Sequence, residues 1–99
     1  MLNSRQRAQL RAMANGMDPI VHIGKGGIGE TVNKQVSDAL FARELIKCCV
    51  LGTAPQSARE TAEEVAAAVG ADVVQVIGSK FILYKKSKNP DITPIELVR

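Results

Sequence analysis

The stretch VHIGKGGIGET, residues 21–31, holds four of the eight glycines of the chain and decides how its surroundings fold. A short apolar strand pattern precedes the glycines, and a helical pattern of apolar residues follows from Ile28. Glycine lets the backbone turn sharply and approach a ligand closely. The free N–H groups at the start of the following helix favour an anion. The stretch therefore predicts a strand, a tight loop at 24–27 and a helix, with a phosphate-like ligand at the loop.

Three binding interpretations of this loop begin from the same residues. A nucleotide-binding P-loop is disfavoured, because Glu30 stands where that motif needs a lysine to reach the phosphates. Gly24, Gly26 and Gly29 match the G-x-G-x-x-G motif of a dinucleotide-binding fold, but the chain lacks the second half of that fold. A G-x-x-G clamp for nucleic acid needs only a turn, a cation and a helix start. The residues of that clamp would be Gly24, Lys25, Gly26 and Gly27, and a purely structural turn remains the other interpretation.

Outward from the loop, the sequence pattern predicts the order α-β-α-β-α-β-β. The predicted helices cover about 4–15, 29–43 and 57–70, and the predicted strands cover 20–23, 45–51, 73–77 and 80–85. Asn3 or Ser4 can cap the first helix, and Ser57 with Glu60 forms a capping box for the third. Strand–helix alternation that ends in a hairpin predicts a two-layer α/β fold with a mixed four-stranded sheet.

The first predicted helix should have one buried and one basic face. Helical spacing places Leu10, Met13, Ala14 and Met17 toward the core. Arg7 and Arg11 lie four residues apart, so we expect them on one exposed face.

Length and composition indicate one soluble domain. The 99 residues are 45% hydrophobic, and no apolar run approaches the roughly 20 residues that cross a bilayer. The first residues lack the apolar segment of a signal peptide, so we expect a cytoplasmic protein. We expect a single domain over 1–87 and a loosely ordered tail over 88–99. Two phenylalanines and one tyrosine argue against a module that stacks bases on several rings.

The net charge of +3 is unevenly distributed along the chain. Residues 1–17 and 80–88 contain basic residues and no acid, whereas 57–72 contains Arg59 and four acids. This balance permits a polyanionic partner. The acidic third helix, with Glu60, Glu63 and Glu64, should face away from one.

The cysteines and the single histidine make a metal or catalytic site improbable. Cys48 and Cys49 are adjacent, so in a strand they point to opposite faces and are poorly placed to bond each other or share a metal. A Cys–His pair would need His22 beside one of them on another strand. We expect the cysteines to act as small hydrophobes, with no metal, no cofactor and no catalytic residue.

Four segments follow one another along the chain: Arg5-Gln6-Arg7 with Leu10-Arg11, Pro19-Ile20-Val21 leading into 23–28, Glu44-Leu45-Ile46-Lys47, and 74–78 with Leu83-Tyr84-Lys85. In this order and spacing, over residues 2–87, the chain resembles the CRM domain family (chloroplast RNA splicing and ribosome maturation). The resemblance is to its stand-alone bacterial form, the YhbY-like RNA-binding proteins.

This resemblance implies a fold like the C-terminal domain of translation initiation factor three, and RNA binding without catalysis. For single-domain bacterial members it implies association with precursors of the large ribosomal subunit, hence ribosomal RNA as partner. Residues 24–27 match the GxxG loop of the family. The basic positions of the family pattern fall on Arg5, Arg7, Arg11 and Lys47. We expect a monomer that binds neither DNA nor membranes.

Some positions leave questions open. Cys49 stands where the family often has a second lysine, and Asn15 where it often has histidine, so a positive charge beside the sheet is lost. Lys47, inside an apolar strand, either extends to the sheet edge or reaches RNA. Lys80, Lys85 and Lys86 form either a basic rim or protection for an edge strand. The alternative function is a small nucleotide- or dinucleotide-binding protein that uses the loop GKGGIGE.

Overall fold

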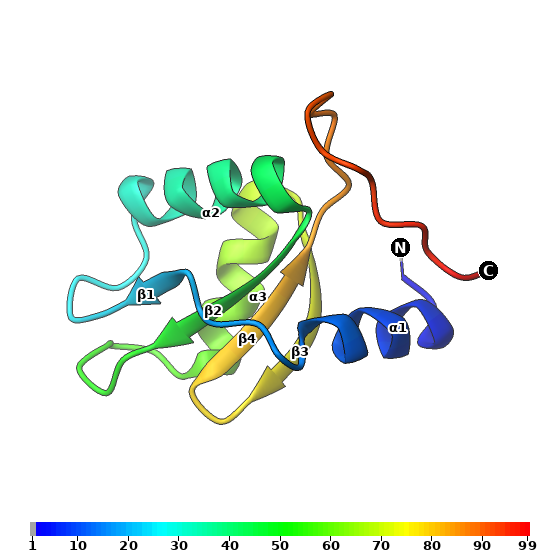
Figure 1. Cartoon of the computed structure of the whole chain (residues 1–99). Coiled ribbons are helices and arrows are strands. Elements are labelled where there is room, and N and C mark those ends of the chain that lie inside the picture. The colour runs from blue at the N-terminus through cyan, green and yellow to red at the C-terminus, as the bar shows by residue number, and fades with distance from the viewer. Residues whose placement is uncertain (1) are drawn as a thin grey trace.

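The computed structural model describes residues 2–99, which form an α/β fold with a mixed four-stranded sheet. The elements are α1 Ser4–Ala14, β1 Val21–Ile23, α2 Glu30–Arg43, β2 Leu45–Val50, α3 Ala58–Val69, β3 Asp72–Ile77 and β4 Lys80–Tyr84 (Figure 1). The predicted element order and sheet are confirmed. Within these residues no helix is both long and apolar enough to span a bilayer.

Local signals explain where the helices begin. Asn3 caps α1 and Ser57 caps α3, each by accepting a hydrogen bond from the backbone N–H of the third helical residue. In both cases that residue, Gln6 or Glu60, bonds back to the cap and completes the capping box. α2 begins differently, since its cap is Gly29, which has no side chain to offer.

The strands lie in the order β1-β2-β4-β3. β1 runs parallel to β2, and β4 runs antiparallel to both β2 and β3. The edge strand β3 contains an irregularity at Val74, between the register pairs Val73–Leu83 and Gln75–Ile82. A bulge of this kind makes an edge less suited to pairing with another chain.

Helices cover both faces of the sheet, because alternate strand residues are apolar on both sides. α2 and α3 cover one face, where the buried residues are Val36, Leu40, Ala62, Val65, Ala66, Ile46, Cys48, Phe81 and Leu83. α1 covers part of the other face, where Leu10 and Ala14 pack with Leu45, Ile82 and Tyr84. The predicted α/β fold class is confirmed, and α1 adds cover on the second face of the sheet (Figure 1).

The predicted faces of α1 are correct only in part. Leu10 and Ala14 are buried, as expected, but Met13 is 46% exposed and Met17 is half-buried. Arg7, expected to be exposed, is half-buried and donates a side-chain hydrogen bond to the Val73 backbone oxygen. The cause is the sheet edge beneath α1, which the helical pattern alone does not reveal.

Residues 85–99 contain no helix or strand and return along α1 (Figure 1). The buried carboxylate of Glu44 accepts hydrogen bonds from the backbone N–H groups of Ser87 and Ile95, both at 2.7 Å. Gln9 accepts from the Val98 N–H, and Ile95 packs against the cluster around Leu10. The sequence predicts that residues 88–99 are loosely ordered, and hydrogen exchange at these backbone contacts can test that prediction.

Candidate nucleic-acid interface

The loop at 24–27 is a tight turn at the end of β1. The Gly27 N–H donates to the Gly24 carbonyl oxygen over 2.9 Å. Gly27 has φ +64, and a Cβ there would lie 2.9 Å from Cγ of Pro55 in the connection between β2 and α3. Only glycine adopts this conformation without strain in so little space. Gly27 therefore serves the backbone geometry, whatever else the loop binds.

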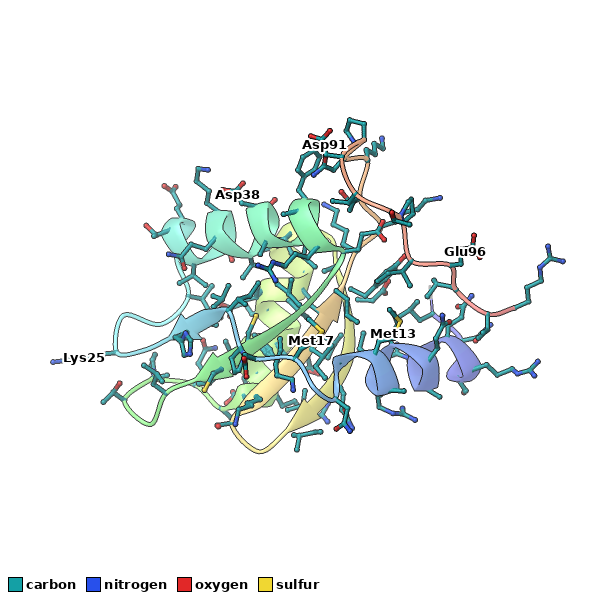
Figure 2. The ribbon with its side chains drawn as sticks, viewed as in Figure 1. Met13, Met17, Lys25, Asp38, Asp91 and Glu96 are labelled. Carbon is teal, nitrogen blue, oxygen red and sulfur yellow. The ribbon has the colours of Figure 1, made fainter. Side chains whose placement is uncertain are left out.

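Lys25 lies at the tip of the same loop and points away from the molecule (Figure 2). Its side chain is exposed, and a Cβ added at neighbouring Gly26 would meet nothing within 4 Å. Both the ammonium group and the backbone beside it are accessible to an external anion.

The start of α2 offers less to an anion than the glycines suggest. Gly29 provides no side-chain cap, so backbone N–H groups of the first turn stay without that partner. Glu30, however, lies in this first turn. Its carboxylate interacts favourably with the helix dipole and repels phosphate. This arrangement further disfavours a P-loop for ATP or GTP.

The three arginines of α1 differ in how free they are. Arg7 is held by the Val73 carbonyl oxygen at the sheet edge. Arg5 is exposed and lies 3.5 Å from the backbone oxygen of Arg99. Arg11 is exposed in the last turn of the helix. Of the three, Arg11 is the best placed to contact an external phosphate, whereas Arg7 also holds α1 on the sheet.

Lys47 projects from the sheet face that α1 covers in part. Its register partner is Ile82 on β4, and Ile82 pairs in turn with Gln75 on β3. The next row across the sheet consists of His22, Cys49, Lys80 and Ile77. Lys80 is exposed and shares the face of Lys47. From the sequence, Lys80 is placed only in a basic rim or in the protection of an edge strand. The strand register that puts it on the face of Lys47 is a non-local property.

The predicted residues form an extended path and not a compact cluster. In Figure 1, α1 and the loop after β1 lie toward opposite ends of the molecule, with β2 between them. The longest dimension of the molecule is 38 Å. Lys25, Lys47, Lys80 and Arg11 are called the basic path below. The predicted site residues 24–27 lie together in the loop, but they lie far from Arg5, Arg7 and Arg11 of α1.

The acidic helix α3 lies on the opposite face of the sheet from Lys47, since its Val65 and Ala66 pack in the cluster with Ile46. Glu63 and Glu64 are exposed on its outer side. The sheet therefore separates Glu63 and Glu64 from Lys47, an arrangement that favours a polyanion on the Lys47 face.

The remaining lysines lie elsewhere. Lys85 donates to the Val69 carbonyl oxygen over 2.8 Å, at the C-terminal end of α3, where a cation complements the helix dipole. Lys86 and Lys88 line a hollow beside Phe41 of α2. We assign Lys85 a structural contact.

The two cysteines differ in burial, since Cys48 is buried and Cys49 is half-buried. Burial, with a smaller contribution from Cys49, raises the pKa of the Cys48 thiol to about 12. A thiol that stays protonated at neutral pH is a poor nucleophile and ligand. His22 and Cys49 are register neighbours, so His22 does lie beside one of the two cysteines on an adjacent strand. Between residues 2 and 99 no group of three or more potential metal-ligating side chains is present.

Comparisons with known proteins agree with the resemblance. The profile of the CRS1/YhbY (CRM) domain matches residues 2–85. The chain is 40% identical over 88 residues to the Bacillus subtilis protein YqeI, named a probable RNA-binding protein, covering 89% of this chain and 92% of YqeI. It is 30% identical over 91 residues to an RNA-binding protein of Haemophilus influenzae, covering 92% of each.

A solved structure is similar over the full length. The solution structure of SAV1595 from Staphylococcus aureus, a candidate RNA-binding protein, shares 44% identity and superimposes with a TM-score of 0.81. The similarity covers 99% of this chain and 100% of that one. Profile, sequence and structure agree, and the chain belongs to the CRS1/YhbY (CRM) domain family.

Proposed function

We propose that this protein binds RNA without catalysing a reaction. We further propose that it acts in the cytoplasm as a monomer, on precursors of the large ribosomal subunit. The names of the relatives support RNA as the partner. The ribosomal role is supported by the resemblance to single-domain members of the family.

The observation that carries the proposal is the separation of charge by the sheet. Lys47 and Lys80 project from one face, and α3 with Glu63 and Glu64 lies on the other. A polyanion that approaches the first face would meet Lys47 and Lys80, while Glu63 and Glu64 lie on the opposite side of the sheet.

The binding mode follows from which groups are accessible. Lys25 and the backbone of 24–27 would hold one stretch of phosphates, and Lys47 and Arg11 would hold others. Contacts of this type go to the RNA backbone and carry little sequence information. They also make affinity strongly dependent on salt, because each neutralised phosphate releases counterions.

Sedimentation of a cell lysate on a sucrose gradient at low salt tests the ribosomal part. We expect the wild-type protein to migrate with precursors of the large subunit, and Lys25→Ala to shift in part toward the top. Arg59→Ala, which removes one exposed positive charge from α3, is the matched control and should migrate as wild type. A wild-type protein found only at the top would contradict ribosomal association.

Equilibrium binding of ATP and NAD separates this proposal from the nucleotide-binding alternative. Glu30 in the first turn of α2 opposes bound phosphates, so we expect no binding at micromolar concentrations. Micromolar affinity for either nucleotide would overturn the proposal of a dedicated RNA-binding protein.

A further inference from the structure

A small hollow lies on the open part of the sheet, near the turn between β3 and β4. Its volume is about 150 Å³, and it is lined by Lys47, Gln75, Ile77, Lys80 and Ile82. These residues come from three adjacent strands, and the register pairs Lys47 with Ile82, Ile82 with Gln75, and Ile77 with Lys80. The hollow is therefore built on the rigid sheet and not on a loop.

The hollow is open because α1 ends its cover before reaching it. Leu10 and Ala14 pack against Leu45 and Tyr84, at the other end of the same face. Ile82, at the boundary, is 3% exposed, whereas Ile77 in the outer row is 59% exposed. The accessible aliphatic surface is thus that of Ile77, beside the hairpin, and it adjoins the buried Ile82.

The rim of this surface is basic. Two of its five lining residues, Lys47 and Lys80, are cationic, and none is acidic. Gln75 adds an amide that can both donate and accept hydrogen bonds. The combination is an apolar floor with cations beside it and one polar group for orientation.

We propose that this hollow receives one unstacked base of single-stranded RNA. Ile77 lies against the face of the base, and the ammonium groups of Lys47 and Lys80 contact the phosphates on either side. The inference deepens the RNA-binding function proposed above and rests on it.

The chemistry of single-stranded RNA matches these groups. An unpaired base has an apolar face and is joined on both sides to anionic phosphates, whereas the bases of a duplex stay stacked. An acidic peptide with an apolar side chain carries similar chemistry. RNA is favoured because two cations and no acid line the hollow, which suits a ligand with a phosphate on each side of its base.

Binding to two oligomers tests this site. One is a short oligouridylate, and the other is the same oligomer with abasic sugars, which keeps the phosphates and lacks the bases. We expect Ile77→Ala to weaken oligouridylate binding about fivefold. The substitution removes side-chain carbons, and a bound base would cover one or two of these methylene-sized groups. Its affinity for the abasic oligomer should stay at the wild-type value.

Two variants complete the design. Phe41→Ala is the matched control, since Phe41 is 53% exposed and lies on α2, on the other face of the sheet. It should bind both oligomers as wild type does. Lys80→Ala should weaken binding of both, because its proposed contact is to phosphate.

The outcomes separate this site from RNA binding in general. If Ile77→Ala binds oligouridylate as wild type does, or loses equally on both oligomers, the base site is wrong. RNA binding itself would stand in that case, provided that Lys25→Ala still weakens both. If wild type binds neither oligomer nor ribosomal RNA, both proposals fail. Tighter binding of a leucine-containing acidic peptide than of oligouridylate would also overturn the base site.

Discussion

Gly27 and Pro55 approach so closely that a Cβ on Gly27 would lie 2.9 Å from Cγ of Pro55. Gly27 also has φ +64, a backbone angle that residues with a side chain rarely adopt. We predict that Gly27→Ala lowers the free energy of unfolding by about 1–3 kcal/mol, through backbone strain and the displaced proline. Urea denaturation measures this change.

The matched control is Gly26→Ala in the same loop. At Gly26 a Cβ would meet nothing within 4 Å, so we expect little change in stability. Equal losses in the two variants would show that the approach of Pro55 does not determine the loop.

The buried Cys48 thiol should make the free energy of unfolding depend on pH in the alkaline range. Burial raises the pKa of its thiol from 9.0 to about 12. Between these values the unfolded chain loses a proton that the folded protein retains, so stability falls as pH rises. The slope is about 1.4 kcal/mol per pH unit for one proton. Urea unfolding of wild type at successive pH values should show this fall.

Cys48→Ala removes that titration. The variant should be less stable at neutral pH, because a buried side chain is shortened, but its stability should fall less steeply above pH 9. Tyr84, whose pKa is raised by burial and by the nearby Glu44 and Asp72, titrates with the same sign in both proteins. Identical pH slopes for the two would contradict the assignment to Cys48.

The Glu44 carboxylate should hold the C-terminal segment in place at two backbone N–H groups. Its carboxylate accepts from the Ser87 and Ile95 N–H groups, and hydrogen bonds to charged groups contribute about 1.5–3 kcal/mol. We predict slow hydrogen exchange at Ile95 in wild type and exchange at least about tenfold faster in Glu44→Ala. Fast exchange at Ile95 in both proteins would favour the loosely ordered tail that the sequence predicts.

Arg7 and Arg11 should separate stability from RNA binding. Arg7→Ala removes the hydrogen bond to the Val73 carbonyl oxygen and should lower the free energy of unfolding by about 1 kcal/mol. Arg11→Ala should leave stability unchanged and weaken RNA binding. Thermal unfolding and filter binding of the two variants test this, and a destabilised Arg11→Ala would count against it.

Local patterns predicted the elements correctly, since their signals lie within a few residues. The helix caps at Asn3 and Ser57 and the turn at 78–79 depend on contacts three residues apart or fewer. The tight turn at 24–27 was equally visible from its glycines, one of which, Gly27, adopts a positive φ.

Non-local contacts were beyond such patterns. Lys80 joins Lys47 on one face only through the pairing of β2 with β4, and Arg7 meets Val73 across 66 residues of sequence. The carboxylate of Glu44 bonds to Ile95, 51 residues away. Each depends on how the strands and the tail are arranged, so helical or strand periodicity alone does not predict it.

The salt dependence of RNA affinity tests the central claim, that cations of the basic path neutralise RNA phosphates. Affinity for a single-stranded ribosomal RNA fragment would be measured over a salt series for wild type, Lys25→Ala, Lys47→Ala and Arg59→Ala. Each variant loses one positive charge. We predict that Lys25→Ala and Lys47→Ala each reduce the slope of log affinity against log salt by about 0.7, and that Arg59→Ala leaves it unchanged. The same slope in all four proteins would contradict the account.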